Sequence, residues 1–346
     1  MQKCSRCLLP DTYPGITFDK DGVCVYCKRG SQITNDISTR QELIKELTAL
    51  SAENREQGRK YDVLVPVSGG VDSCNTLIDL VETYQLRPLV FHNDHGYEDE
   101  TATQNVQKLC KALQVDLIIQ QHDTVFMKKL WKCVNRSSLP LSGCYVCGNI
   151  LYLNALELAS RFGINMVING YSKGQIYMVH DKNKGHDLLE MLLEIIEGTN
   201  DSEFIRQFFE KYNILQKRVA FESKRDFQVL RQSNKILVLP FFLFSFHRLD
   251  KEKLKKRVMN ICDWRPLKHS YPGRTTNCKM VWLNCYMDLQ KMGYSCYHEE
   301  YSELIRKNEI SRKQAEIDLE LVPPAGLLKE LADDIGVPLT NNCLDF

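Results

Sequence analysis

The sequence predicts an α/β protein built on a doubly wound parallel sheet, with a small cysteine-rich segment before the sheet and a mainly helical region after it. Short apolar, β-branched runs alternate along the chain with segments whose apolar residues recur at helical spacing. The connections between them are short, as in parallel strands joined through helices. A glycine turn also stands directly between a buried strand and a helix, at residues 68–73. We expect three parts, at residues 1–35, 36–245 and 246–346.

The bulk composition places the chain among globular proteins of the cytoplasm. Its 346 residues are 43% hydrophobic and 26% charged, and the formal net charge of +1 provides no overall basic field for binding nucleic acid. We see neither a signal peptide nor an apolar run of membrane-spanning length, so we expect a cytoplasmic protein without membrane contact. Fourteen cysteines are many for such a chain. Because the cytosol keeps thiols reduced, paired cysteines there are expected to bind metal or to react.

The first elements are two C-x-x-C pairs, Cys4 with Cys7 and Cys24 with Cys27. Their separation fits one tetrahedral site of four thiolates, and the turn residues at 19–22 allow the two pairs to fold together. Zinc is the metal that most often forms such closed structural sites. Because residues 1–35 are too few to bury a core, the metal would supply much of this knuckle's folding energy.

A charged helix at about 39–58 leads into the first strand, at 61–67. The glycine turn follows, and a second helix begins at Asp72. This order of strand, glycine loop and helix directs free backbone N–H groups and the positive end of the helix at one point, which suits a phosphate. The loop lacks the Gly-Lys-Ser/Thr ending of a Walker A motif. The alternative is an ordinary glycine turn without a ligand.

The loop resembles the SGGxDS motif of the PP-loop ATP pyrophosphatases. Enzymes of that family cleave ATP between the α- and β-phosphates and activate a carbonyl oxygen as its adenylate. The resemblance implies a site for ATP and Mg²⁺, in which Asp72 and Ser73 are catalytic. The matching residues are Ser68, Gly69, Gly70, Val71, Asp72 and Ser73.

A second resemblance concerns the N-terminus. The run from Cys4 to Cys27 is similar to the start of proteins known as N-acetyl sugar amidotransferases and of their PP-loop relatives. Together with the loop, this resemblance spans roughly the first half of the chain.

The second strand, at 87–94, ends in the polar residues Asn93 and Asp94, and His95 follows. Polar groups at the carboxyl end of a parallel strand line the ligand crevice, and the resemblance places adenosine here. The alternative is a solvated loop. Further elements are expected as a helix at 101–113, a strand at 116–120 and a helix at 126–134.

Another pair, Cys144 and Cys147, opens a helix that ends at Gly163, before a fourth strand at 166–169. A helix N-terminus lowers the pKa of a thiol, and the thiolate is the form that binds metal or attacks carbon. Two other interpretations remain: the pair consists of buried small apolar residues, or it belongs to a second zinc site.

This layout resembles the tRNA thiolases of the PP-loop group. In those enzymes such a pair joins a later cysteine to hold a [4Fe-4S] cluster, whose open iron carries sulfide to the activated carbon. Their loop after the fourth strand touches ATP. The residues of this chain at that place are Gly170, Tyr171, Ser172 and Lys173.

We predict that Cys278 is the third cluster ligand, because it stands in a polar loop that begins a helix, as Cys144 does. Cys262, Cys285 and Cys296 are the competing candidates. Arg274, in the same loop as Cys278, is expected to bind a phosphate or carboxylate.

The remaining segments follow the helical pattern, with one exception. A helical insertion is expected near 181–231, and a fifth strand at 235–241 closes the sheet. A helix at 251–258 carries a modest basic face, and an amphipathic helical tail of the kind that packs on a neighbour begins at Leu304. We expect a homodimer.

The function favoured by the sequence is sulfur transfer in two steps. A substrate carbonyl oxygen displaces pyrophosphate from ATP, and a sulfur species then displaces AMP. The substrate is a small molecule or an RNA, and a partner protein would donate the sulfur. One alternative is an amidotransferase that acts on an N-acetyl sugar with ammonia from a partner glutaminase; another is a nucleotide-binding sensor without chemistry.

Overall fold

The protein is described from a computed structural model. The structure describes residues 1–30, 37–121, 124–170, 188–215, 218–220, 235–240, 251–267, 271–272 and 277–339. The predicted nucleotide-binding residues Tyr171, Ser172, Lys173 and Arg274 lie outside these ranges.

Six parallel strands form one sheet, in the order β3-β2-β1-β4-β6-β5. The central strand β1 pairs with β2 through Leu64 and Leu89, and with β4 through Leu64 and Val167. The predicted fold class, a doubly wound parallel sheet, is confirmed. The strands are β1 (Val63–Pro66), β2 (Pro88–Asp94), β3 (Asp116–Gln121), β4 (Met166–Asn169), β5 (Arg218–Ala220) and β6 (Ile236–Pro240).

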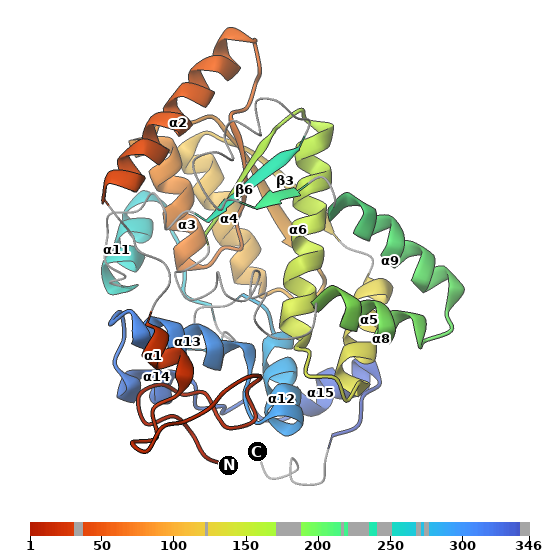
Figure 1. Ribbon diagram of the computed structural model, residues 1–346. Coiled ribbons are helices and arrows are strands. Elements are labelled where there is room, and N and C mark those ends of the chain that lie inside the picture. Colours follow the sequence, from red (N-terminus) through yellow and green to blue (C-terminus); the bar gives the residue numbers. More distant parts are fainter. Residues whose placement is uncertain are drawn as a thin grey trace.

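Helices cover both faces of the sheet, because successive strand residues point to opposite sides. Leu64 belongs to the core beneath α5 and α6, whereas Val63 and Val65 belong to the core beneath α2, α3, α4 and α11. Figure 1 shows these two groups of helices on either side of the strands. The helices before β4 are α1 (Val25–Arg29), α2 (Ile37–Glu56), α3 (Val71–Ile78) with a π-helical continuation η1 (Asp79–Thr83), α4 (Glu100–Leu113), α5 (Thr124–Arg136) and α6 (Gly143–Arg161).

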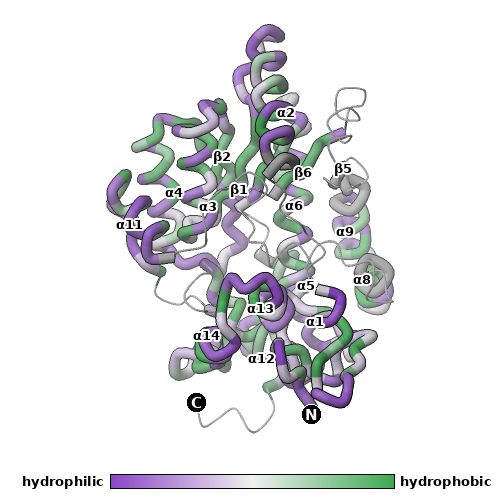
Figure 2. The backbone as a smooth tube through the Cα atoms, turned by 60° about the vertical axis from the view of Figure 1, so that its left-hand side comes forward, coloured by the Kyte–Doolittle hydropathy of each residue, from purple (hydrophilic) through white to green (hydrophobic). Residues whose placement is uncertain are grey.

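Some of the helices after β4 complete the layers on the two faces of the sheet. The others form a separate group below it. Figure 1 shows α12 to α15 next to the N-terminal segment, and Figure 2 shows that α11 and α14 are largely hydrophilic. These helices are α8 (Leu188–Glu197), α9 (Ser202–Leu215), α11 (Lys251–Ile261), α12 (Met280–Met292), α13 (Cys296–Arg306), α14 (Arg312–Asp318) and α15 (Leu327–Ile335).

Two details differ from the sequence prediction. The segment expected to be a helical insertion contains strand β5, which pairs with β6 beyond the strand expected to close the sheet. A strand of three residues is too short to show an alternating pattern, so only its pairing with β6 identifies it. Leu304 does not begin a tail, because it lies within α13.

The N-terminal segment packs on the turn between α12 and α13. Tyr13 forms an edge-to-face contact with Tyr294, with 5.2 Å between the ring centroids. The backbone N–H of Leu8 donates to Ser302 Oγ at 3.1 Å, and Thr12 Oγ1 donates to the Met292 carbonyl at 2.6 Å. The knuckle therefore forms part of the C-terminal helical layer.

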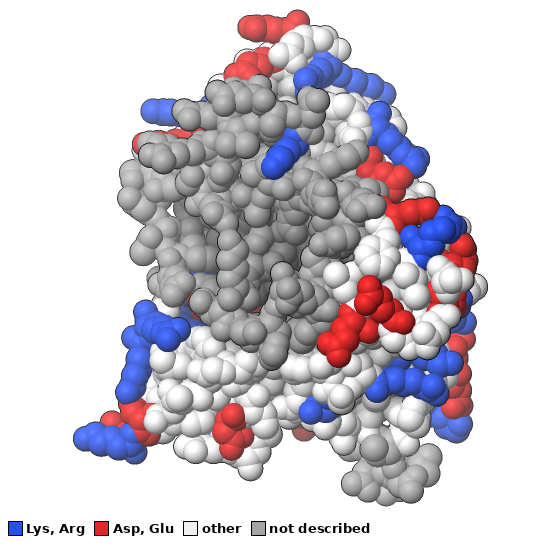
Figure 3. Space-filling model, turned by 45° about the vertical axis from the view of Figure 1, so that its right-hand side comes forward, with Lys and Arg blue, Asp and Glu red and all other residues white. Residues whose placement is uncertain are grey.

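The described surface carries both signs of charge. On the face in Figure 3, acidic and basic side chains are interspersed on the described residues. Among the helices described, none combines the length and the apolar character that crossing a membrane requires.

Candidate active site

The glycine loop joins β1 to α3 and is closed by hydrogen bonds between its own serines. Ser73 Oγ accepts from the backbone N–H of Ser68 at 3.2 Å and lies 3.1 Å from Ser68 Oγ. Ser73 Oγ also donates to the Gly70 carbonyl at 3.1 Å. These contacts fold the loop over the first turn of α3, where Asp72 lies.

Gly69 allows the loop to press against α4. Its φ of +82° is a conformation that side chains disfavour, and a Cβ there would lie 2.3 Å from the Ala102 carbonyl oxygen. The Gly69 carbonyl accepts from Trp264 Nε1 at 2.9 Å and from Asn105 Nδ2 at 3.4 Å. Because this carbonyl is bound on the α4 side, the loop peptide is fixed in one orientation.

Gly170 brings the end of β4 against the start of α3. A Cβ at Gly170 would lie 2.7 Å from Ser73 Cα, so no larger residue fits at this position unless the glycine loop moves. Gly170, which the sequence predicted as a nucleotide-binding residue, thus shapes the site because its backbone lies close to Ser73.

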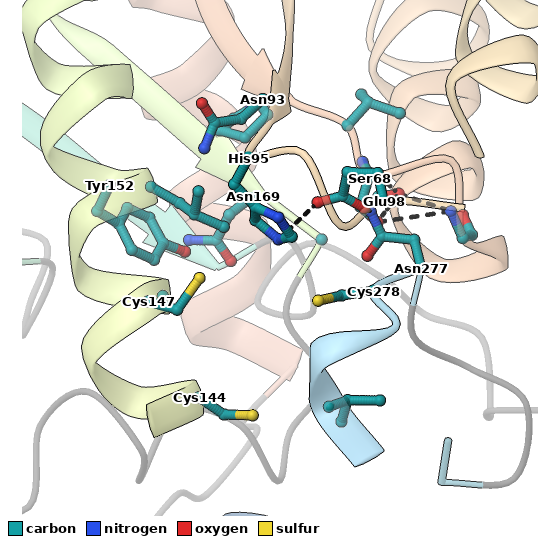
Figure 4. A pocket seen from close by; sticks show the side chains of 18 of the residues that line it. Ser68, Asn93, His95, Glu98, Cys144, Cys147, Tyr152, Asn169, Asn277 and Cys278 are labelled. Carbon is teal, nitrogen blue, oxygen red and sulfur yellow. Dashed lines mark hydrogen bonds and ion pairs between the residues drawn. The ribbon is translucent and has the colours of Figure 1, made fainter. Parts of the chain in front are cut away.

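A cavity of about 290 Å³ opens at the carboxyl edge of the sheet. Such a volume suits a small ligand. The described residues that line it include members of the glycine loop, the ends of β2 and β4, the start of α6 and the start of α12 (Figure 4). Those with predicted roles are Ser68, Gly70, Asp72, Ser73, Asn93, Cys144, Cys147, Gly170 and Cys278.

Three predicted residues do not line the cavity. Val71 is buried in the core beneath α2, α3 and α4, and Gly69 faces α4. Asp94 accepts from the backbone N–H of Gly96 at 2.8 Å and from Gln121 Nε2 at 3.3 Å, so it caps the loop after β2.

Cys278 faces a buried histidine and carboxylate. An antiparallel bridge pairs Cys278 with Glu98, and the Cys278 thiol lies within hydrogen-bonding reach of His95. His95 Nε2 lies 2.9 Å from Glu98 Oε1, and Asn277 donates to the other Glu98 oxygen. Figure 4 shows this group on the cavity wall.

Burial and neighbouring charges shift the pKa values of His95 and Cys278. Burial opposes a charged His95, but Cys278 and Glu98 outweigh it and raise the pKa of this imidazole well above its usual value. Burial raises the pKa of the Cys278 thiol, although His95 opposes the rise. The cavity wall therefore carries a buried imidazole with a raised pKa, beside a carboxylate and a thiol whose pKa is also raised.

Cys144 belongs to a second group of thiols. Its Sγ, with those of Cys285 and Cys296, forms a set whose members all lie within 4.8 Å of one another. Hydrogen bonds from Cys285 and Cys296 lower the pKa of the Cys144 thiol, and Asn284 Nδ2 donates to it at 3.5 Å.

The knuckle cysteines have the geometry of a tetrahedral metal site. The sulfurs of Cys4 and Cys27 lie 3.9 Å apart, and those of Cys7 and Cys24 lie 3.7 Å apart. Zinc–sulfur bonds of about 2.3 Å place tetrahedral ligands about 3.8 Å apart. Three backbone N–H groups donate to Cys4 Sγ at 3.2 to 3.4 Å, from Arg6, Cys7 and Cys24. These residues fit one zinc ion.

The three predicted iron–sulfur ligands share one cavity but face different partners. Cys144, Cys147 and Cys278 line one cavity, whereas Cys262 packs against the core on the other face of the sheet. Cys144, however, gathers with Cys285 and Cys296, and Cys278 faces His95. Thiolates on one cubane stand roughly 6–7 Å apart, farther than the set around Cys144. The ligand set of a cluster therefore stays a prediction.

Sequence reasoning gave no site role to Glu98 or Asn277, and it named Cys285 and Cys296 only as competing cluster ligands. The bridge between Glu98 and Cys278 joins residues 180 positions apart, and nothing local in the sequence signals it. For His95 the sequence does contain a signal of a site role: it follows the polar residues Asn93 and Asp94 directly after β2.

A curated protein is similar to this chain over most of its length. No protein-family model matches the chain. The chain is 22% identical over 319 residues to the uncharacterized protein MJ1599 of Methanocaldococcus jannaschii, covering 92% of this chain and 93% of that protein.

Solved structures show similarity at low identity. The U34-tRNA thiolase NcsA from Methanococcus maripaludis with its [4Fe-4S] cluster is 12% identical, with a TM-score of 0.37, covering 99% of this chain and 91% of that chain. The NH3-dependent NAD synthetase from Campylobacter jejuni is 13% identical, with a TM-score of 0.32, covering 64% and 94%. A predicted subunit of a tRNA methyltransferase from Methanocaldococcus jannaschii is 12% identical, with a TM-score of 0.32, covering 68% and 91%.

These three structures are PP-loop proteins, and their TM-scores with this chain lie below 0.5.

Proposed function

We propose that this chain is an ATP-dependent PP-loop enzyme that adenylates a carbonyl oxygen of its substrate and then replaces that oxygen with sulfur. The observation that supports this proposal is the shared cavity: residues of the glycine loop and the thiols of Cys144, Cys147 and Cys278 all line it. Activation and replacement both require the same substrate carbon, so their groups must meet in one place.

The loop provides the activating half of the reaction. Ser68, Gly70, Asp72 and Ser73 would surround the β- and γ-phosphates, and the N-terminus of α3 favours their negative charge. The described lining residues include no lysine or arginine. Asp72 would hold Mg²⁺, which would neutralise the negative charge of the phosphate oxygens. The substrate oxygen then attacks the α-phosphorus, and pyrophosphate leaves.

The cysteine-lined side provides the replacing half. Adenylation converts a poor oxide leaving group into AMP, so a sulfur nucleophile at this side can displace it. His95 lines the cavity together with Cys278, where a hydrogen bond from its ring would stabilise negative charge on the departing oxygen. The small cavity suits a small carbonyl compound or a single base of an RNA. A partner protein would supply the sulfur.

Amidotransfer is the second candidate, and the spacing of the thiols around Cys144 favours it. Sulfurs within 4.8 Å of one another suit a single ion, which has no sulfide to donate. Ammonia would then displace AMP from the same adenylate.

The test measures AMP and pyrophosphate formation with sulfide or with ammonium, in the presence of either unmodified tRNA or N-acetyl sugars. Asp72→Ala and Ser73→Ala should lower the rate by at least about 10²-fold, because both groups stand where the phosphates converge. Ser160→Ala, on the exposed end of α6, is the matched control and should retain the rate.

The isotope found in the product distinguishes sulfur transfer from amidotransfer. Incorporation of ³⁵S supports sulfur transfer, and incorporation of ¹⁵N supports amidotransfer. Unchanged AMP formation in Asp72→Ala removes the loop from the mechanism, and ATP binding without any product identifies a sensor.

A further inference from the structure

Three thiols that are remote in sequence meet below the cavity. Cys144 lies in the first turn of α6, Cys285 in the middle of α12 and Cys296 at the first position of α13. Cys285 and Cys296 are completely buried, and Cys144 is partly exposed. Within the described residues, this set and the knuckle are the two groups of at least three cysteine, histidine or carboxylate side chains that lie close enough to hold one ion.

Asp288 holds the three helix segments together. It lies one helical turn after Cys285 and is completely buried. Ser142 Oγ, at the N-cap of α6, donates to Asp288 Oδ2 at 2.6 Å. The backbone N–H of Cys296 also interacts with this carboxylate. One buried side chain therefore fixes the starts of α6 and α13 on either side of α12, and the site is built rather than accidental.

The spacing of the sulfurs identifies the type of ligand. Three sulfurs within 4.8 Å of one another fit the roughly 3.8 Å edges of a tetrahedral zinc-type site. They are closer than the roughly 6–7 Å between thiolates on a cubane. Soft thiolate ligands without carboxylates select zinc-like ions over magnesium or calcium.

The position of Cys144 shows where a fourth ligand would come from. Cys144 lines the cavity together with Asn284 and Tyr297, whereas Cys285 and Cys296 do not. Structural zinc sites have four protein ligands, and catalytic sites have three with one open position. We propose that Cys144, Cys285 and Cys296 bind one zinc-class ion with an open coordination position toward the cavity.

This site is distinct from the knuckle, and it excludes the predicted cluster of Cys144, Cys147 and Cys278 because both would use the Cys144 thiolate. Its open position would take a small electron-pair donor such as water, sulfide or ammonia. Asn284, which donates to Cys144 Sγ, would orient that ligand thiolate from outside the coordination shell. The inference rests on thiol geometry and not on the proposed reaction.

The test is a metal count on the full-length protein purified under anaerobic conditions. We expect two zinc-class ions per chain, one in the knuckle and one in this site. Cys285→Ser and Cys296→Ser should each lose one ion and keep the other. Cys147→Ser and Cys278→Ser, which alter thiols of the same cavity, should keep both.

Retention of the knuckle ion and of the thermal transition shows that a variant has folded. If Cys285→Ser fails this check, Co²⁺ replacement in the wild-type protein provides a second readout, since two tetrahedral thiolate sites should fill in sequence. One ion per chain in wild type, a disulfide within the set, about four irons with sulfide, or ion loss in Cys278→Ser would each overturn the proposal. A correct metal count without ATP-dependent AMP formation would refute the proposed function while leaving this inference intact.

Discussion

The two groups of cysteines differ in how the chain assembles them and in what they face. The knuckle brings together four thiols from two C-x-x-C pairs within the first 27 residues, and all four are buried. The set of Cys144, Cys285 and Cys296 draws on three helices and reaches the cavity through one member. The number of protein thiols and their access to the cavity separate a closed structural site from one that is suited to bind a reactant.

The groups that support the sulfurs differ in the same way. Backbone N–H groups donate to the knuckle sulfurs, so the local fold itself sets their positions. In the other set, side chains of Asn284 and Asp288 fix the arrangement, through contacts with Cys144 and Ser142. The positions of the knuckle sulfurs should therefore be insensitive to substitutions elsewhere in the chain. The positions of the sulfurs in the second set should change with small shifts between α6 and α12.

The largest effect is expected from breaking the knuckle. Cys4→Ser or Cys24→Ser should remove its ion and lower the free energy of unfolding by on the order of 4–5 kcal/mol, because metal binding supplies folding energy. Denaturant unfolding with a metal count measures both quantities. Cys110→Ser, at a buried cysteine outside both groups, should keep both ions. Full stability in Cys4→Ser would show that the knuckle needs no metal.

A smaller effect is expected from separating α6 and α12. A Cβ at Gly143 would lie 2.4 Å from Asn284 Oδ1, an atom that also accepts from Asn135 at 3.0 Å. Gly143→Ala should lower the free energy of unfolding by about 1–3 kcal/mol through overpacking, and should weaken metal binding at Cys144 alone.

Thermal unfolding and metal competition with a chelator measure the Gly143→Ala effect. In the control Gly198→Ala, the new Cβ would have its nearest neighbour at 3.3 Å, so little change is expected. Equal weakening of both metal sites would show that the two groups are not independent.

The effect that is smallest per pH unit concerns Glu299 on α13, between the two groups. Burial raises the pKa of Glu299 to about 8, although a hydrogen bond from Tyr13 and the charge of Arg306 oppose the rise. Because the folded pKa lies above the unfolded value of about 4.3, the stabilising contribution is complete below about pH 4 and is lost as pH rises through 8. The free energy of unfolding should therefore fall across this range by at most about 1.4 kcal/mol per pH unit.

The pH effect is isolated by comparing wild type with Glu299→Gln between pH 5.5 and 8.5. The variant lacks the ionisation and should show a flatter profile, whereas Glu316→Gln, on the exposed side of α14, should follow wild type. Parallel profiles for wild type and Glu299→Gln would show that Glu299 titrates normally.

The sequence could predict what depends on neighbouring residues. The strand, glycine loop and helix around Ser68–Ser73 follow from local pattern, as do the knuckle pairs, and the structure places these elements as expected. The bridge of Glu98 with Cys278 depends on how two loops meet, and no local pattern encodes it.

Cys144 and Cys147 illustrate the same limit. The C-x-x-C pattern predicts that both thiols act together, because residues three apart share one helix face. In the structure Cys144 meets Cys285 and Cys296, while Cys147 lies outside that set. The positions of α12 and α13, which the sequence pattern does not fix, divide the pair.

The packing of the knuckle on the turn between α12 and α13 has a consequence for protein synthesis. The contact between Leu8 and Ser302 joins residues 294 positions apart. The ribosome delivers the knuckle first and its packing surface hundreds of residues later, so the knuckle can take up metal long before it packs. Cys285 and Cys296 emerge with that same late surface. The nascent chain can therefore load the knuckle early, whereas the thiol set of Cys144 forms only when the C-terminal helices close against the N-terminal segment.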